Sequence, residues 1–298
     1  MQEYYFANYR LLMDEGINRD KFMAYISDFK GVMPYSHTFC LHLGDHKLLD
    51  RVYNDALKYP VVCSTDRFDI IDTGNGWAIV PLMDELVIEQ NGKYVVLCSR
   101  DYTDLTLYVS NQPFFSDRIK KWYLPAIPFS TGIRAACEIG ICLNDGLPVH
   151  ASLIEKDGYG IVFLGPSGMG KSTQAKLWQK YQGADFIIGD RPCLRCIDGI
   201  WYGFGMPWDG KDRIMNQKKV PVKALISLEQ SKVNEITRLD MQQSMMVLLK
   251  QVMLPMWDDA ATDSVSRTMC QLASQIPMYH LKNLADKEAT DLTLQAIG

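Results

Sequence analysis

The first half of the chain alternates short apolar runs with polar turns, which is the pattern of half-buried β-strands. The pair Asn91-Gly92 stands between two such runs and predicts a tight hairpin. An aromatic-rich run at 4–12 is followed by helical patterns at 19–29, with Asn18 as the N-cap, and at 48–58. Alternation predicts a strand at 36–43. The strands of an antiparallel meander are predicted from alternation and turn signals at 68–72, 77–82, 85–90, 93–99 and 105–109.

The second half mixes strand-like and helical patterns. It begins after a break at 144–148, where the sequence Asn-Asp-Gly-Leu-Pro interrupts the apolar helical pattern of 125–143. We therefore expect a β-rich α+β domain at 1–145 and an α/β domain with a mixed sheet and flanking helices at 146–298. Strands are predicted at 149–154, 159–164, 186–188, 192–197, 200–204, 222–228 and 276–281, and helices at 241–253, 258–274 and 286–297.

Four methionines in this half recur near helical spacing, which predicts that they pack in the core. They are Met241, Met245, Met246 and Met253.

The composition limits the classes of protein to which the chain can belong. The 298 residues are 47% hydrophobic and 22% charged, which is an ordinary globular balance. A net charge of −4 gives no general attraction to nucleic acid or to anionic membranes. The amino-terminal residues lack a secretory pattern, and no apolar run approaches the roughly 18 residues that cross a bilayer.

The eight cysteines are scattered through a long chain and do not form a disulfide framework. Cys193 and Cys196 have the spacing of a zinc or redox pair, but no second pair accompanies them and they lie in a strand-like run. We expect a cytoplasmic protein without nucleic-acid or membrane partners. The sequence does not decide whether the protein forms oligomers.

The strongest chemical signal is a glycine-rich segment that follows one strand-like run and leads into a helical one. This is the context of a phosphate-binding P-loop, the Walker A motif. Glycines let successive N–H groups point into one concavity, the lysine reaches the β- and γ-phosphates, and the following serine hydroxyl binds Mg²⁺. The predicted nucleotide-binding residues are Gly165, Pro166, Ser167, Gly168, Met169, Gly170, Lys171, Ser172 and Thr173.

Three further segments accompany this loop. The segment 149–153, Val-His-Ala-Ser-Leu, precedes the loop, and 186–191, Phe-Ile-Ile-Gly-Asp-Arg, follows it together with the Gly- and Trp-containing segment 202–211. In this order and spacing, residues 148–285 resemble the catalytic domain of HPr kinase/phosphorylase and the related HPr-kinase-like proteins with a phosphoenolpyruvate-carboxykinase-type nucleotide-binding core. The resemblance implies an α/β fold built on a P-loop core.

The resemblance also assigns roles to His150 and Asp190. In that family two adjacent aspartates divide metal binding and proton acceptance, whereas here Arg191 takes the second position, or Gly189 the first if the alignment shifts by one residue. Either alignment leaves one carboxylate. We expect Asp190 to bind Mg²⁺ with Ser172 or to accept the substrate proton, and His150 to serve as an alternative base because imidazole titrates near neutral pH.

The remaining candidates are basic or aromatic residues that could contact substrate or phosphate. Arg191 could stabilise phosphate charge or pair with a surface acid. Trp208, Lys211 and Arg213 lie in a predicted loop that could hold a base or a second anionic group, or could be a solvated connection with one buried Trp.

The function expected from these features is that of an ATP-dependent and Mg²⁺-dependent kinase, with nucleotide and a hydroxyl-bearing protein, peptide or small molecule as its partners. The first domain is a candidate for substrate recognition or assembly. A second hypothesis is a nucleotide-binding regulatory or scaffold protein that has lost turnover, which the single carboxylate favours. Carboxykinase chemistry and GTPase-like switching are disfavoured because the chain shows neither the additional metal-binding Lys and His set nor an Asn-Lys-x-Asp segment.

Overall fold

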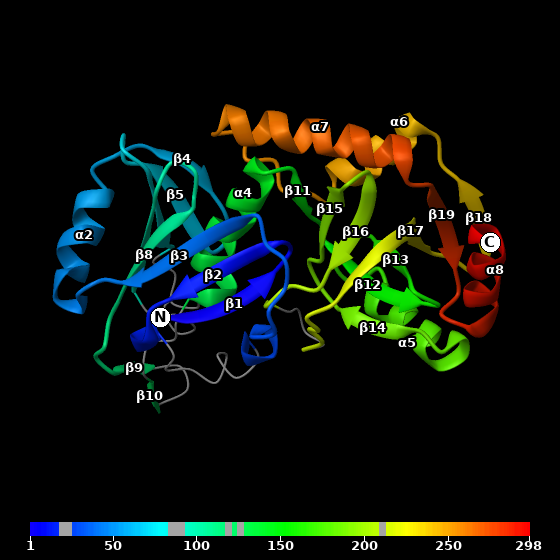
Figure 1. Ribbon diagram of the computed structural model, residues 1–298, viewed down its shortest axis with the longest axis horizontal. Helices are drawn as coiled ribbons and strands as arrows, with labels where there is room; N and C mark the ends of the chain where they lie inside the picture. The colour runs from blue at the N-terminus through cyan, green and yellow to red at the C-terminus, as the bar shows by residue number, and fades with distance from the viewer. Residues whose placement is uncertain (18–25, 83–92, 117–120, 124–127, 209–212) are drawn as a thin grey trace. The chain divides into compact units, whose positions relative to one another are not determined.

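The computed structural model describes residues 1–17, 26–82, 93–116, 121–123, 128–208 and 213–298. The chain divides into two compact units, Met1–Gly140 and Ile141–Gly298. The division falls inside helix α4 (Arg134–Leu143), ahead of the Asn144 to Pro148 break. Each unit is a mixed α/β structure built on one large sheet (Figure 1).

The first unit is built on an eight-stranded sheet with the order β1-β2-β3-β8-β7-β6-β5-β4. The strands from β4 to β8 pair antiparallel with their neighbours, as expected for a meander, whereas β2-β3 and β3-β8 are parallel. The strands are β1 (Gln2–Phe6), β2 (Tyr9–Met13), β3 (His37–Leu43), β4 (Val61–Ser64), β5 (Phe68–Asp72), β6 (Trp77–Pro81), β7 (Tyr94–Cys98) and β8 (Asp104–Val109).

Short helices and a small ribbon complete this unit. Helix α2 packs on the sheet through Leu49 and Tyr53, which bury against Ile71 and Val95. The other elements are η1 (Glu15–Ile17), η2 (Ser27–Phe29), η3 (His46–Leu48), α2 (Leu49–Ala56), the β9–β10 ribbon (Phe114–Ser116 and Lys121–Tyr123) and the π-helical turn η4 (Phe129–Ile133) before α4. Most of the predicted helix at 19–29, and the predicted strand at 85–90 with its Asn91-Gly92 turn, lie outside the described residues.

The second unit carries a nine-stranded sheet. Its main path is β11-β15-β16-β17-β13-β12-β14, and β19 joins β17 while β18 joins β19. Strands β13, β17 and β19 are parallel, so their carboxyl ends meet at one edge. The strands are β11 (Gly146–Pro148), β12 (Ala151–Lys156), β13 (Tyr159–Leu164), β14 (Asp185–Ile188), β15 (Cys193–Ile197), β16 (Ile200–Phe204), β17 (Lys219–Gln230), β18 (Glu235–Arg238) and β19 (Met278–Asn283).

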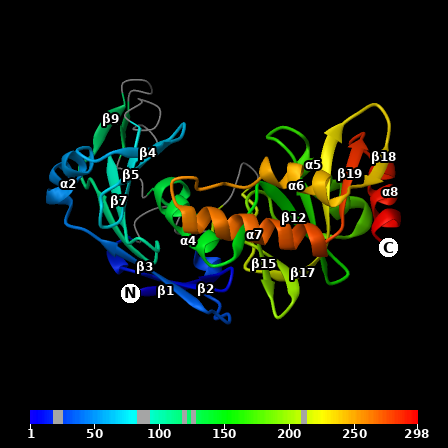
Figure 2. The same cartoon turned by 90° about the horizontal axis from the view of Figure 1, so that it is seen from above.

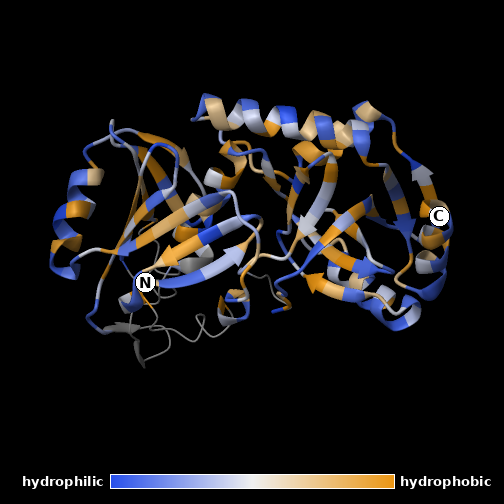
Figure 3. Cartoon of the chain, viewed as in Figure 1, coloured by the Kyte–Doolittle hydropathy of each residue, from blue (hydrophilic) through white to orange (hydrophobic). Residues whose placement is uncertain are grey.

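Helices bury their apolar faces in this unit. Helix α5 places Ala175 and Trp178 against Phe163 and Ile226 of the central strands, and the Phe163 and Trp178 rings lie 6.2 Å apart. Hydrophobic stretches accordingly alternate with hydrophilic ones along the strands (Figure 3). Helices α6 and α7 pack against each other (Figure 2). The helices are α5 (Lys171–Gln182), α6 (Met241–Leu249), α7 (Asp259–Gln275) and α8 (Lys287–Ile297).

The structure corrects the expectation that the methionines of α6 pack in the core. Met241 is 51% exposed and Met246 is 54% exposed, so neither packs in the core. Met245 and Met253 are half-buried. The buried positions of this helix are Ser244 and Leu248. The spacing of the methionines is helical, but spacing alone does not determine which face of a helix meets the sheet.

Candidate functional site

The glycine-rich segment connects the carboxyl end of β13 to the first turn of α5. Gly165 is buried, whereas Pro166, Ser167 and Gly168 are exposed. Gly168 has φ +83° and Gly170, which caps α5, has φ +101°. Side chains disfavour these left-handed backbone angles, and glycine adopts them without a steric penalty. The glycines therefore allow a tight loop whose outer residues face solvent.

Lys171 is the first residue of α5, and its side chain folds back along the loop. Only 8% of the residue is exposed. Its Nζ donates to the Gly165 carbonyl at 2.7 Å and to the Pro166 carbonyl at 3.2 Å, and lies 3.2 Å from His150 Nε2. Burial lowers the pKa of the Lys171 ammonium, and the charge of Asp190 opposes this shift. A cation thus lies at the base of the loop, at the amino end of a helix.

His150 precedes β12 and lies between Lys171 and Asp190. Its Nε2 is 3.7 Å from Asp190 Oδ1. An ammonium group can only donate, so Nε2 accepts from Lys171 and the imidazole proton resides on Nδ1. Burial is the main cause that lowers the pKa of His150, followed by the positive charge of Lys171. The neutral imidazole is therefore favoured in this arrangement.

Asp190 lies in the turn that follows β14. Ser152 Oγ donates to the Gly189 carbonyl at 2.9 Å and fixes this turn to β12. Asp190 Oδ1 is buried and accepts no hydrogen bond from the described residues. A buried carboxylate oxygen without a donor is costly, so it is suited to a proton donor or a cation supplied by a ligand.

Arg191 follows Asp190 with φ +57°. An arginine is unusual in this left-handed region, and the residue before a proline, here Pro192, is normally extended. Such strain persists only where the surrounding structure imposes it, and it is commonest at functional sites.

Gly205 and the described residues 213–216 lie close to the same turn. A Cβ at Gly205 would lie 1.9 Å from the Asn216 carbonyl oxygen, so only glycine allows this backbone approach. The antiparallel bridge between Ile188 and Met215, and the bond from Gly189 N–H to the Ile214 carbonyl, bring the backbone of Arg213 alongside the turn that contains Asp190.

The predicted substrate contacts in this segment differ in accessibility. Arg213 is exposed. Trp208 is 1% exposed, so its contact with a ligand would first require the ring to be uncovered. Lys211 lies outside the described residues. Contacts between these three residues and a substrate stay predictions.

The site offers oxygen ligands for a metal ion. Ser172 follows Lys171 in the first turn of α5 and is half-buried, and Thr173 is exposed. Within the described residues no group of three or more His, Cys, Asp and Glu side chains could hold a metal ion. Cys193 and Cys196 are free thiols on one strand, and their spacing of three points them to opposite faces. A zinc or redox pair is therefore not formed there.

Sequence reasoning missed Gln251, which follows α6. This residue is 6% exposed, and its backbone carbonyl accepts from His150 N–H at 2.7 Å. With its amide nitrogen turned toward the site, Gln251 donates to the Gly165 carbonyl at 3.1 Å and to the His150 carbonyl at 3.2 Å. No motif in the sequence marks this glutamine, because its partners lie some eighty to one hundred residues earlier in the chain.

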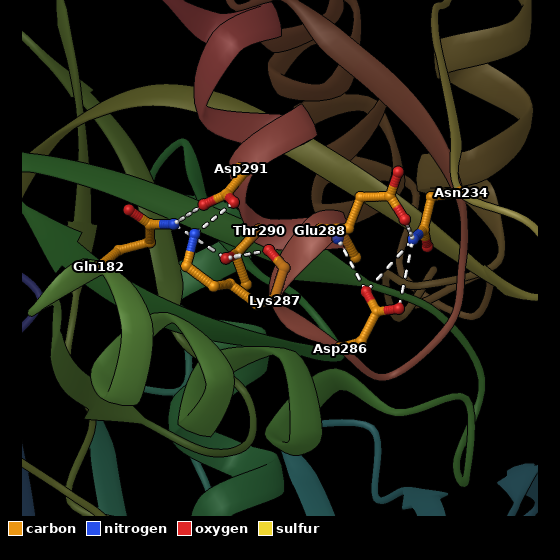
Figure 4. Close-up of polar contacts among 8 residues, drawn as sticks. Gln182, Asn234, Asp286, Lys287, Glu288, Thr290 and Asp291 are labelled. Carbon is orange, nitrogen blue, oxygen red and sulfur yellow. Dashed lines mark hydrogen bonds and ion pairs between the residues drawn. The ribbon is translucent and has the colours of Figure 1, made fainter.

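Helix α5 is held near both ends by polar side chains from the last part of the chain. Near its amino end, Gln174 Nε2 donates to Asn283 Oδ1 at 2.7 Å. At its carboxyl end, Gln182 Nε2 donates to Thr290 Oγ1 at 2.9 Å and to Asp291 Oδ1 at 2.7 Å (Figure 4). The same view shows Asn234 between Asp286 and Glu288 at the start of α8.

Comparisons with known proteins add little to this geometry. No protein-family model matches the chain, and no curated protein matches it. Among solved structures, the chain is similar to the Hpr(Ser) kinase/phosphatase from Coxiella burnetii, with 13% sequence identity and a TM-score of 0.28. The match covers 50% of this chain and 86% of that chain. Among the described residues, no helix combines the length and the apolar character needed to pass through a bilayer.

Proposed function

We propose that the chain is an ATP-dependent and Mg²⁺-dependent phosphotransferase that acts on a hydroxyl group. One observation carries the proposal: Lys171 lies at the amino end of α5 below a glycine loop, with His150 at 3.2 Å and Asp190 3.7 Å beyond it. A cation, a base and a carboxylate therefore lie close to one loop whose outer residues are exposed. Phosphoryl transfer needs this combination because its catalysis consists mostly of positioning and of neutralising phosphate charge.

The residues of the site have distinct roles in this proposal. The loop amides of 165–173 and the amino end of α5 bind the β- and γ-phosphates, and Lys171 exchanges its two carbonyl partners for phosphate oxygens. The acceptor oxygen attacks the γ-phosphorus, and the bond to the ADP oxygen breaks. The acceptor proton passes to Asp190, or to His150 Nε2 once Lys171 Nζ has turned from the imidazole to the phosphates. Arg191 and Arg213 supply positive charge near the transferred group.

Magnesium fits the donors of this site. Ser172 offers a hydroxyl and Asp190 a carboxylate, and the buried Asp190 Oδ1 lacks a hydrogen-bond donor in the described part of the chain. These are hard oxygen ligands of the type that Mg²⁺ prefers when nucleotide phosphates and water complete its shell. The bound ion would neutralise charge on the β- and γ-phosphates.

A nucleotide-binding regulatory protein without turnover is a second candidate. The observation in its favour is that Asp190 is followed by Arg191 and not by another carboxylate. Metal binding and proton acceptance would then compete for one side chain, unless His150 accepts the proton.

The experiment is a binding and transfer assay on the full chain. Calorimetry with Mg²⁺ and ATP measures association, and labelled ATP with a panel of hydroxyl metabolites and serine or threonine peptides measures transfer. We expect binding, and label transfer to at least one acceptor class. Binding without transfer or hydrolysis supports the regulatory candidate, and absence of binding refutes both.

Two variants locate the activity in this site. Lys171→Met removes the ammonium group and is expected to weaken ATP binding at least about tenfold, because a charge-assisted contact contributes roughly 1.5 to 3 kcal/mol. The matched control is Lys180→Met in the last turn of the same helix, where the side chain is exposed. Asp190→Asn is expected to abolish Mg²⁺-dependent transfer while the protein stays folded. Equal affinities in the Lys171 and Lys180 variants would place the nucleotide elsewhere.

A further inference from the structure

We infer that Gln251 is a positioning residue that couples the carboxyl end of α6 to the phosphate loop and to His150. The inference rests on the proposed function. It adds a residue to that site which makes no contact with the reacting atoms and which lies outside every motif of the sequence.

The position of Gln251 follows from the local backbone. Helix α6 ends at Leu249, and Val252 then forms an antiparallel bridge with Val149. This bridge brings the Gln251 carbonyl within 2.7 Å of the His150 N–H. The segment after α6 thus extends the sheet where β12 begins and holds the backbone of the candidate base.

The side chain of Gln251 adds a second link. Two carbonyl oxygens, those of Gly165 and His150, face its amide at 3.1 and 3.2 Å. Two acceptors require a donor between them, so the amide nitrogen points toward both. Because Gln251 is 6% exposed, water cannot readily replace this donor.

The Gly165 carbonyl connects the side chain of Gln251 to the candidate site. It accepts from Lys171 Nζ at 2.7 Å and from the Gln251 amide at 3.1 Å, and a carbonyl oxygen has two lone pairs to share. Gln251 therefore binds the first residue of the loop and the backbone of His150 at once. Its side chain sets the spacing between the ammonium group of Lys171 and the imidazole of His150.

The test compares variants of the full chain. Gln251→Met keeps the length of the side chain and removes the donor, and Gln251→Glu replaces the donor by a carboxylate that faces two carbonyl oxygens. The matched control is Gln243→Glu on α6, where the side chain completes the capping box with Asp240 and glutamate serves equally well. Thermal unfolding of each variant establishes that the protein is folded at the temperature of the measurements.

Two measurements follow on each protein. Hydrogen exchange of the free protein compares peptides that cover 149–154 and 164–172 with a peptide from β16. We expect faster exchange in the first two peptides for both Gln251 variants and exchange like the wild type for Gln243→Glu. Calorimetry with Mg²⁺ and ATP should give affinities at least about tenfold weaker for the Gln251 variants alone.

The outcomes separate this inference from the proposed function. Unchanged exchange near the loop and His150 overturns the role of Gln251, whatever the nucleotide affinity. Faster exchange with unchanged affinity also overturns it, because the residue would then serve stability only. A wild-type protein that binds no nucleotide refutes the proposed function, and the link between Gln251, the loop and His150 is then judged on the exchange data alone.

Discussion

At the scale of single residues, burial and charge act in opposite directions on three groups of the site, which are Lys171, His150 and Asp190. Lys171 and Asp190 attract each other, while burial disfavours the charged forms of Lys171 and His150. The cost of burying Lys171 Nζ is offset by three partners, which are two carbonyl oxygens and the imidazole of His150. Phosphate oxygens would replace neutral carbonyl partners of Lys171 with anionic ones, which strengthens the same hydrogen bonds.

The backbone strain at Arg191 can be tested by substitution with glycine. We predict that Arg191→Gly keeps or raises the free energy of unfolding by up to about 1 kcal/mol, because glycine removes the left-handed penalty. It should also weaken nucleotide binding or transfer, since the guanidinium is lost. The control is Asp198→Gly, at φ +52° in the hairpin turn between β15 and β16, which should change stability similarly and leave binding unchanged. Loss of stability in Arg191→Gly would show that the conformation stores no strain.

The lowered pKa of His150 predicts how stability depends on pH. The folded state holds the His150 proton less tightly than the unfolded state does, so the unfolded chain binds more protons between the two pKa values. Stability is therefore expected to fall as pH drops from about 7 through the ordinary histidine value near 6.5. Chemical denaturation of the wild type and of His150→Gln at several pH values measures this. The variant should show the shallower pH dependence, and equal slopes would contradict the assignment.

At the scale of elements, the helix after the loop is anchored by partners that are distant in sequence. Gln174 is 1% exposed and Asn283 is 8% exposed, and their hydrogen bond joins the first turns of α5 to the end of β19. Asn283 Nδ2 also donates to the Glu229 carbonyl at 3.0 Å, which extends the link to β17. These bonds bring the carboxyl ends of two parallel strands to the base of the helix that begins at Lys171.

The hydrogen bond between Gln174 and Asn283 predicts that a second substitution restores part of the stability that the first one removes. Asn283→Ala should lower the free energy of unfolding by about 1 to 3 kcal/mol, because it leaves the buried Gln174 amide without its acceptor. Adding Gln174→Met to that variant should restore part of the loss by removing the unpaired amide. Gln182→Met, at the less buried end of α5, is the control and should cost less. Denaturant titration measures the wild type, the single variants Asn283→Ala, Gln174→Met and Gln182→Met, and the double variant. Strictly additive effects of Asn283→Ala and Gln174→Met would exclude the coupling.

At the scale of the whole molecule, each compact unit buries a core of its own. The glycine loop, His150, Asp190 and Gln251 all belong to the second unit, Ile141–Gly298. Ligand binding to a folded unit stabilises that unit by an amount set by ligand concentration and affinity.

We therefore predict that Mg²⁺ and ATP protect the two units unequally. At one hundred times the dissociation constant, opening of the second unit should become about 2.7 kcal/mol more costly. Hydrogen exchange in mild denaturant should then slow in peptides from 141–298 more than in peptides from 1–140. Equal slowing in both units would show that they open together, and slowing confined to the first would place the nucleotide there.

The local order of the elements in the second unit could be predicted from sequence because it depends on short-range patterns. The strand ahead of the loop and the helix after it follow from an apolar run, left-handed glycines and a helical pattern, all within about twenty residues. The same holds for the β5 to β8 meander. The short strands β4 and β18 went unpredicted because most of their residues are exposed and give no alternation of apolar and polar positions. Strand β11 went unpredicted because it lies inside the Gly- and Pro-containing break at 144–148.

The sequence by itself determined that a glycine-rich loop with a lysine joins a strand to a helix, because those backbone requirements are local. Only the tertiary structure decided that His150, Lys171 and Asp190 meet within hydrogen-bond or ion-pair distance, that Met241 and Met246 face solvent, and that Gln251 lies behind the loop. These outcomes depend on strand register and on the pairing of segments far apart in the chain. Such pairings leave no local pattern, because each residue's partner is set by the fold and not by its neighbours.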